Sequence, residues 1–324
     1  MLGAVGDTVT TGNVARQAGD GEPQGLSFKA IAALGIVWIV WGSTYMAMRV
    51  AVQALPPFEL AAARFYVAPA ILFAISALRR EPWAPWREVR GSAIVGLFLL
   101  FAGNGMVVWS VQYIPSGLSA LLVASLPLWT LGLESLLGGA RPTLTGLAGI
   151  LLGFVGVVTL MWPGLGAGWN QALWAEVLVL GGTVAWAVGT LIGRRIPVPA
   201  SSLQNSAWQM LAAAVGFTIL TAALREPLVS PSTVPWWAWG AIAYLVVFGS
   251  CVAFSAYAWL VQNVRPDLVA TYAYVNPVVA VGLGAVFLHE PVTAWTLAGA
   301  ALIVGSVALV IRGASPAGRR GGTL

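Results

Sequence analysis

The chain has 324 residues, of which 59% are hydrophobic and only 8% are charged. A water-soluble domain usually carries about a quarter charged residues, so this composition excludes a soluble enzyme, a nucleic-acid-binding protein and a disordered regulator. Cys251 is the single cysteine and His289 the single histidine, which excludes an internal disulfide and a histidine metal site. The composition therefore predicts a polytopic membrane protein.

Ten apolar windows have the roughly 20 residues that a helix needs to cross a bilayer. They lack the alternating pattern of barrel strands, and backbone groups in lipid must be satisfied within the segment, so all ten are predicted to be helices. Residues 1–27 and 313–324 are expected to form polar tails. The windows are 28–48, 58–78, 92–113, 116–139, 143–162, 172–193, 203–224, 236–262, 266–288 and 292–312.

The basic residues predict the orientation, because Lys and Arg concentrate in cytoplasmic loops. With the N-terminus placed in the cytoplasm, 13 of the 16 basic residues lie on the cytoplasmic side. Arg49 and Arg225 then lie outside, and Arg64 lies within a span. We therefore expect both termini in the cytoplasm.

The two halves of the chain repeat each other. At an offset of 150 residues, segments 93–161 and 243–311 are identical at 16 of 69 positions. Earlier in the chain the offset is 145. A match at a fixed offset indicates duplication. The most informative pairs are Trp109 with Trp259, Gln112 with Gln262, Pro127 with Pro277, Trp41 with Trp186, and Arg49 with Arg194.

Residues 28–162 and 172–312 are thus expected to be two five-helix repeats. Because five is an odd number, the second repeat enters the membrane from the opposite side and is inverted. Inverted repeats around a midplane site are common in secondary transporters. The alternative is that duplication only builds a large helical bundle.

Several short motifs follow one another in a fixed order. They are Trp41-Gly42-Ser43-Thr44 before Arg49, Ala61-Ala62-Ala63-Arg64-Phe65, Gly117-Leu118-Ser119-Ala120 before Pro127, Asp267-Leu268-Val269-Ala270 before Asn276-Pro277, and His289-Glu290-Pro291. In order, spacing and duplication, the chain resembles the EamA branch of the drug/metabolite transporter superfamily over nearly all of 28–312.

The resemblance implies ten helices around a central cavity between the halves, and export of small metabolites, including amino acids, by alternating access. It also implies a bacterial inner-membrane location and places the fifth and tenth helices at the periphery. One departure is that the first half has Ala140 where the second has Glu290. Any role of that acidic position is therefore not carried over to the first copy.

Four polar residues within spans are candidate substrate ligands. Asn104, Ser125 and Asn276 lie near the midplane of their spans, where they would bond either a substrate's amino and carboxyl groups or a neighbouring helix. Arg64 lies outward of the middle of the second span. It would attract a carboxylate, or else serve a structural role by bonding carbonyls and loop ends.

Four aromatic residues are further candidates: Trp109, Trp259, Tyr257 and Tyr272. A cavity walled by such rings would suit apolar or aromatic amino acids and lipophilic cations. The alternative is that the rings fill helix interfaces.

Two prolines are candidate hinges. Pro127 and Pro277 occupy equivalent positions in the fourth and ninth spans, and a proline inside a helix frees the carbonyl four residues back, here Val123 and Ala273. The two kinked helices would be moving parts, or else carry static kinks.

Glu134, in the fourth span, is a candidate for proton coupling, because a desolvated carboxyl takes up protons more readily. The alternative is that the Glu134 carboxylate is paired near the membrane–water interface. Glu176, near the outer end of the sixth span, is a weaker candidate.

The sequence thus predicts a secondary transporter exporting small metabolites, most of all neutral or aromatic amino acids. The alternatives are an uncoupled channel or facilitator, a multidrug exporter of lipophilic cations, and an intramembrane enzyme. No HExxH pair and no nucleotide-binding motif is found, so we expect neither a metal or other cofactor nor a nucleotide-binding subunit. The expected partners are the substrate and the bilayer, without nucleic acid, in a monomer or weak dimer.

Overall fold

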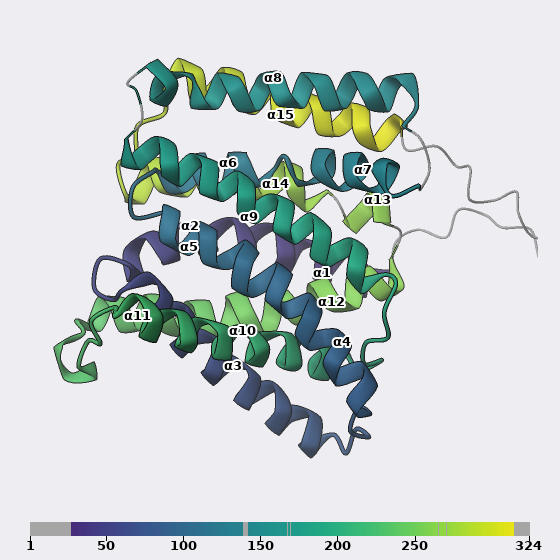
Figure 1. The fold of residues 1–324 in the computed structure, drawn as a ribbon, viewed down its shortest axis with the longest axis vertical. Coiled ribbons are helices and arrows are strands. Elements are labelled where there is room, and N and C mark those ends of the chain that lie inside the picture. Colours follow the sequence, from purple (N-terminus) through teal and green to yellow (C-terminus); the bar gives the residue numbers. More distant parts are fainter. Residues whose placement is uncertain are drawn as a thin grey trace, which may run out of the picture.

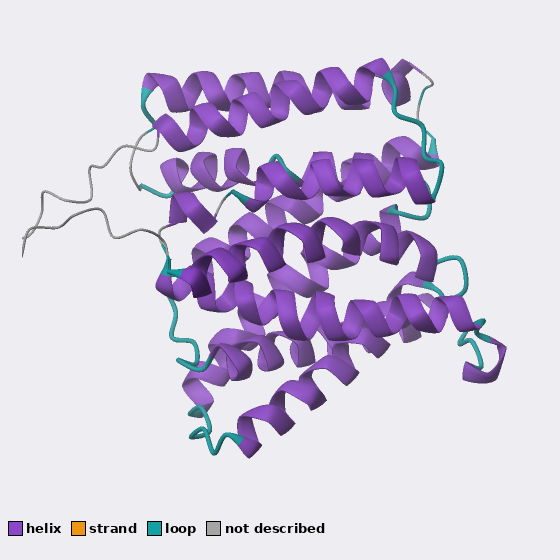
Figure 2. Ribbon diagram, turned by 180° about the vertical axis from the view of Figure 1, so that it is seen from behind, coloured by secondary structure: helices purple, strands orange, loops and turns teal. Residues whose placement is uncertain are grey.

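A computed structural model describes residues 27–138, 142–166, 168, 170–264, 266–269 and 271–313. This part of the chain is helical and contains no strand (Figure 2). Nine of its helical segments are long and apolar enough to cross a membrane, and Tyr272–Phe287 is a shorter apolar helix. These findings confirm the prediction of an all-α polytopic membrane protein. Both predicted tails lie almost entirely outside the described residues.

The helices follow the predicted windows closely. The first five spans are α1 (Phe28–Ile36) with η1 (Val37–Trp41) and α2 (Gly42–Ala51); α3 (Pro57–Leu78); α4 (Trp86–Gly96) with η2 (Leu97–Asn104) and α5 (Gly105–Ser110); α6 (Ser116–Val123) with α7 (Leu126–Leu136); and α8 (Leu144–Gly166). The last five are α9 (Gln171–Gly193); α10 (Ser202–Leu224); α11 (Trp236–Tyr244) with η4 (Leu245–Ala253) and α12 (Phe254–Asn263); α13 (Pro266–Val269) with α14 (Tyr272–Phe287); and α15 (Ala294–Gly313). The short helix η3 (Pro231–Thr233) lies in the loop before α11.

Local sequence explains where several helices begin. The Ser27 hydroxyl accepts a hydrogen bond from the Ala30 N–H, and the Asn170 side chain accepts one from the Leu173 N–H. Such caps satisfy N–H groups that the first turn of a helix leaves without a partner. Pro57 stands at the first position of α3, where its missing N–H costs nothing.

The pair α8 and α15 forms a separate layer along one side of the molecule (Figure 1). The two helices approach closely at glycines. A methyl group added to Gly149 would lie 2.9 Å from the Ser306 carbonyl oxygen, and one added to Gly156 would lie 2.8 Å from the Ile303 side chain. Because small residues let two helix backbones touch, these glycines explain the tight pairing.

Two spans contain π-helical turns at equivalent places. The segments η2 and η4 lie in the third and eighth spans, and they overlap when one is shifted by 150 residues. A third such segment, η1, lies in the first span. Wide π turns are frequent at functional sites, and these three adjoin the central cavity described next.

Candidate functional site

A cavity lies in the middle of the molecule, with about 850 Å³ of empty space when the open solvent that adjoins it is included. Side chains from the first four spans and from the sixth to ninth spans line it, so both halves contribute. None of its lining residues belongs to α8 or α15. The peripheral pair therefore stays away from the cavity, as the family resemblance implied.

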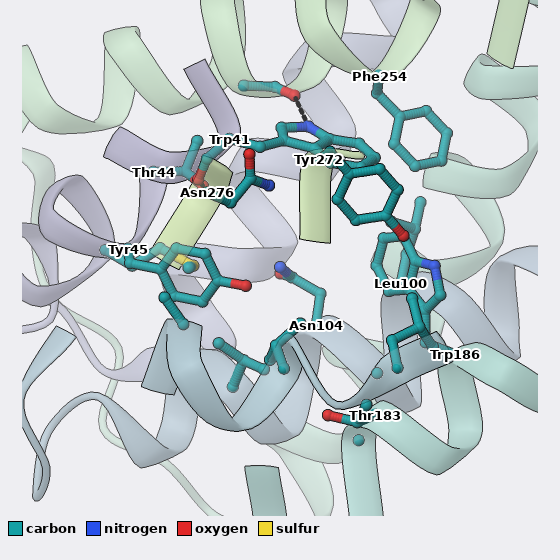
Figure 3. A pocket seen from close by; sticks show the side chains of 18 of the residues that line it. Trp41, Thr44, Tyr45, Leu100, Asn104, Thr183, Trp186, Phe254, Tyr272 and Asn276 are labelled. Carbon is teal, nitrogen blue, oxygen red and sulfur yellow. Dashed lines mark hydrogen bonds between the residues drawn. The ribbon is translucent and has the colours of Figure 1, made fainter. Parts of the chain in front are cut away.

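Aromatic rings form one wall of this cavity (Figure 3). The Trp41 ring meets Trp186 and Tyr272 edge to face, with centroids 5.9 and 5.5 Å apart. Phe254 lies 6.1 Å from the same ring. The Trp41 Nε1–H donates to the Gly249 carbonyl at 3.4 Å, which fixes the indole in place. An aromatic wall of this kind offers flat apolar surfaces to a ring or hydrocarbon chain.

The opposite part of the cavity carries polar side chains. The Asn104 amide and the Tyr45 hydroxyl both point into the open space (Figure 3). Asn276 is only 6% exposed, and its Oδ1 atom has no hydrogen-bond partner. Since buried polar atoms are normally satisfied, the Oδ1 atom of Asn276 is available to a bound molecule.

Arg64 supplies a positive charge to the cavity wall. The side chain is 7% exposed, its Nε donates to the Ser250 hydroxyl at 2.7 Å, and its guanidinium lies 4.9 Å from the centroid of the Phe65 ring. No acidic residue of the described chain lies within ion-pair distance of it. A buried charge without a counter-ion is costly, so Arg64 favours an anionic group in the cavity.

Four of the eight predicted substrate ligands line the cavity: Asn276, Asn104, Tyr272 and Arg64. Tyr257 does not line it, but lies just behind the wall, with its ring centroid 4.8 Å from that of Trp41. Counting residues along each span predicts the depth of these residues in the membrane but not the side of the helix on which each one lies.

The other three predicted ligands lie elsewhere. Ser125 is fully buried, donates to the Leu122 carbonyl and accepts a hydrogen bond from the indole of Trp129. Trp109 packs on Tyr113, with centroids 4.7 Å apart. The Trp259 ring lies under the Lys29 ammonium at 4.3 Å. These three side chains have packing contacts and do not line the cavity, and a role of any of them in substrate binding stays a prediction.

Several cavity residues were not among the predicted ligands. They are Trp41, Thr44, Tyr45, Thr183 and Trp186. The 145-residue offset pairs Trp41 with Trp186, so the duplication carried a signal for both. Thr44 belongs to the Trp41-Gly42-Ser43-Thr44 motif, but nothing in the sequence marked Tyr45 or Thr183, because threonine and tyrosine are frequent on packed helix faces.

The two predicted hinges differ in geometry. The fourth span is broken at Ala124 and Ser125, and Pro127 stands in the first turn of α7. Pro277 instead lies inside the continuous helix α14, which begins at Tyr272, after the separate short helix α13. The break in the fourth span exposes Val123, Ala124 and Leu126 to the cavity. Whether either proline moves during transport stays a prediction.

Glu134 lies outside the central cavity. Its carboxylate pairs with Arg194 at 3.9 Å, and the two side chains are 38% and 47% exposed. Pairs of this kind contribute little to stability because water screens them. A role of Glu134 in proton coupling stays a prediction.

A second cavity lies between the α8–α15 pair and the rest of the bundle, with about 640 Å³ of empty space when the adjoining open solvent is included. Its wall includes Glu176 and Glu290. Glu290 accepts hydrogen bonds from the Ser116 N–H, the Ser116 hydroxyl and the Gly117 N–H, so it caps the start of α6. The Oε2 atom of Glu176 is buried and has no hydrogen-bond partner. The sequence position equivalent to Glu290 is Ala140, which lies outside the described residues.

Comparison with known proteins identifies the family. A model of the EamA-like transporter family matches residues 28–162 and 173–312. The chain belongs to this family. A protein of Escherichia coli K12, named as the uncharacterized inner membrane transporter YedA, is 38% identical over 87% of this chain and 90% of its own length.

More distant EamA relatives agree with this assignment. A Salmonella typhimurium protein named as a probable amino-acid metabolite efflux pump is 26% identical over 86% of this chain and 93% of its own length. A solved crystal structure with 22% sequence identity superposes with a TM-score of 0.63, over 87% of this chain and 96% of that one, which supports the fold. The chain is therefore a multi-pass inner-membrane transporter of the EamA family.

Proposed function

We propose that this transporter exports small metabolites that carry a carboxylate and an apolar body, above all neutral or aromatic amino acids, by alternating access. The observation that carries this proposal is the position of Arg64, which is buried in the cavity wall and has no acidic partner among the residues that the structure describes. An arginine holds a carboxylate well because its planar fork matches the two carboxylate oxygens.

The remaining lining suits the rest of an amino acid. The unpartnered Oδ1 of Asn276 would accept a hydrogen bond from a substrate ammonium group. Trp41, Trp186 and Tyr272 would cover an apolar or aromatic side chain. One cavity thus offers a zwitterion a cationic group, a hydrogen-bond acceptor and an aromatic surface.

Alternating access is supported by the origin of the lining residues. Trp41 and Trp186 are equivalent positions of the two halves at the 145-residue offset, and Leu126 and Asn276 are equivalent at 150. If the halves are inverted copies, exchanging their conformations turns a cavity open to one side into a cavity open to the other. The distribution of basic residues supports cytoplasmic termini. This orientation would tell which face of the protein carries the cytoplasmic opening of the cavity and which carries the external one.

The proposal is tested with purified protein in liposomes. Labelled phenylalanine should accumulate transiently against an unlabelled internal pool, and unlabelled phenylalanine should compete. Phenethylamine, which lacks the carboxylate, should compete at least 10-fold more weakly, whereas 3-phenylpropionate should retain most of the competition. Equal competition by phenethylamine would overturn the role of a carboxylate. Uptake without trans-stimulation would show an uncoupled facilitator.

Substitution of Arg64 gives an independent check. Arg64→Met should abolish exchange of phenylalanine, and Arg64→Lys should recover part of it because the charge is kept. Export of lipophilic cations is not favoured, because Arg64 is the only charged side chain among the cavity residues and its charge is positive. Preferential exchange of a cationic dye would reverse this conclusion.

A further inference from the structure

The helices α3 and α10 run antiparallel, and hydrogen bonds join them at both ends. Each is followed by the tripeptide Arg-Glu-Pro, 80–82 after α3 and 225–227 after α10, again 145 residues apart. Arg80 and Arg225 share the same left-handed backbone, with φ of 54°. The N–H of the following glutamate donates to the carbonyl of Ser76 in one copy and of Thr221 in the other. The two ends are therefore equivalent structures on opposite faces of the molecule.

At one end, which we call the Gln204 latch, an amide joins the two helices. The Gln204 Nε2 donates to the Ser76 hydroxyl at 3.0 Å and to the Pro82 carbonyl at 2.9 Å, and its Oε1 accepts from the Ala84 N–H at 2.9 Å. Glu81 accepts hydrogen bonds from the Ser76 hydroxyl and from the Ser201 hydroxyl. Gln204 is almost fully buried, and every polar atom of its amide is used.

At the other end, which we call the Glu59 latch, the residue equivalent to Gln204 is Glu59. Its carboxylate accepts from the Val229 N–H at 3.1 Å, just as Gln204 accepts from Ala84. The Glu59 N–H donates to the Glu226 carboxylate at 3.2 Å, and the Thr221 hydroxyl donates to the same oxygen at 3.4 Å. Two acidic residues thus lie next to each other where the first latch has one amide and one carboxylate.

Comparing the Gln204 latch with the Glu59 latch shows which hydrogen-bonding atoms differ. In the Gln204 latch the Nε2 hydrogens bond a hydroxyl and a proline carbonyl. The equivalent acceptors in the Glu59 latch are Thr221 and Pro227. An ionised carboxylate has no hydrogen to donate to them, whereas a protonated carboxyl group has one. One proton on the carboxyl pair therefore supplies one of the two donations that the amide makes, and the ionised pair supplies neither.

We propose that a proton taken up by the Glu59–Glu226 pair closes the Glu59 latch, so that the contact between α3 and α10 is pH-sensitive on this face alone. The Gln204 latch contains an amide in place of one acid and is insensitive to pH over the same range. None of the residues of either latch lines the central cavity. The proposal therefore stands apart from the identity of the substrate.

No basic side chain compensates the two acids. The charged groups at this end are Glu59 on α3, Arg225 and Glu226 in the loop before α11, and Arg49 at the end of α2, whose guanidinium donates to the Val111 carbonyl. Neither carboxylate forms an ion pair within the described part of the chain. The start of α11 has no charged residue. The charged residues of α4, which also packs on α10, lie at the other end; they are Arg87, Glu88 and Arg90.

The surroundings of Glu226 agree with this proposal. Burial raises the pKa of the Glu226 carboxyl above its usual range, and the neighbouring charge of Glu59 raises it further, although hydrogen bonds from Glu59, Phe58 and Thr221 act in the opposite direction. A carboxyl whose pKa is raised in the folded protein stabilises the fold below its unfolded pKa. That contribution is lost as the pH rises through the folded pKa.

The test measures thermal unfolding of the purified full-length protein between pH 4 and pH 8. The wild type should lose about 2 °C or more in Tm as the pH rises above the usual carboxyl range. Glu59→Gln copies the Gln204 latch onto this face, and it should remove that loss. The reciprocal Gln204→Glu should add a second pH-dependent loss. Hydrogen exchange in the segment 225–235, corrected for intrinsic rates, should rise with pH in the wild type and not in Glu59→Gln.

If Glu59→Gln keeps the wild-type dependence of Tm and of local exchange on pH, the proposal is wrong. Glu226→Gln is the second variant, because it removes the other acid and should also flatten both profiles. It keeps the test decisive even if a carboxyl at the buried position 204 prevents folding. A folded Gln204→Glu protein that gains no pH dependence would contradict the equivalence of the two latches.

Discussion

Trp41 and Trp186 stand 145 residues apart in the chain, and their rings meet nearly perpendicular with centroids 5.9 Å apart. They are equivalent positions of the duplicated halves, so each half contributes the same residue to one wall of the cavity. The contact places the junction of the two halves at the site where we expect substrate to bind. An edge-to-face pair of this kind is worth about 0.5–1.5 kcal/mol beyond the apolar area it buries.

Replacing Trp186 by Ala should weaken transport of an aromatic amino acid. The substitution removes one face of the aromatic wall, and we expect KM for phenylalanine exchange to rise about 10-fold, which corresponds to roughly 1.4 kcal/mol. Trp186→Phe should recover most of the affinity because a flat ring remains. The measurement is counterflow in liposomes over a range of phenylalanine concentrations.

Trp259→Ala is the matched control for that experiment. Trp259 was predicted to face the cavity, but its ring lies under Lys29 and not among the cavity residues. Its removal should leave KM within about twofold of the wild type. A larger effect of Trp259→Ala than of Trp186→Ala would contradict the assignment of the cavity.

The sequence predicted the fold well because membrane insertion leaves few choices. Apolar windows of about 20 residues must form helices, and the windows near 58–78 and 172–193 agree with α3 and α9 within a few residues. The equivalence of Pro127 and Pro277 did not predict equal geometry, since only the first lies at a break between helices. A proline weakens a helix, but packing of the neighbouring spans determines whether it is interrupted there.

The candidate site was predicted only in part, for a related reason. Depth along a span follows from counting residues, and Asn104 and Asn276, predicted near the midplane, both line the cavity. The side of the helix that faces the cavity depends on how the spans rotate against each other. Ser125 lies at the same depth but points into the break of its own span, where it bonds the Leu122 carbonyl. The spacing of apolar residues along a span does not show which side of the helix faces the cavity, because lipid and protein interior are both apolar.

Substituting Gly149 should loosen the peripheral helix pair. A methyl group there would lie 2.9 Å from the Ser306 carbonyl oxygen and equally close to the Val310 nitrogen, and neither backbone atom can move aside alone. We expect Gly149→Ala to lower the free energy of unfolding by about 1–3 kcal/mol. The measurement is thermal unfolding in detergent.

Gly35→Ala serves as the control for this prediction. Gly35 is also helical, but a methyl group added to it would meet no atom within 4 Å. Because alanine favours a helix more than glycine does, this change should be neutral or stabilise by up to about 1 kcal/mol. Equal losses from Gly149→Ala and Gly35→Ala would show that close approach of α8 and α15 is not the cause.

The loop after α3 allows a test of backbone strain with two neighbouring arginines. Arg80 has a φ of 54°, in the left-handed region that side chains other than glycine adopt at a cost, whereas Arg79 has a φ of −79°. Both side chains are exposed, and each substitution by glycine removes one positive charge. Arg80→Gly should therefore raise the free energy of unfolding by about 1 kcal/mol. Arg79→Gly should lower it by about 0.5–1 kcal/mol, because glycine there only adds freedom to the unfolded chain. Thermal unfolding of the two variants side by side measures the difference, and shifts of the same sign would show that the loss of charge, and not the backbone conformation, governs this loop.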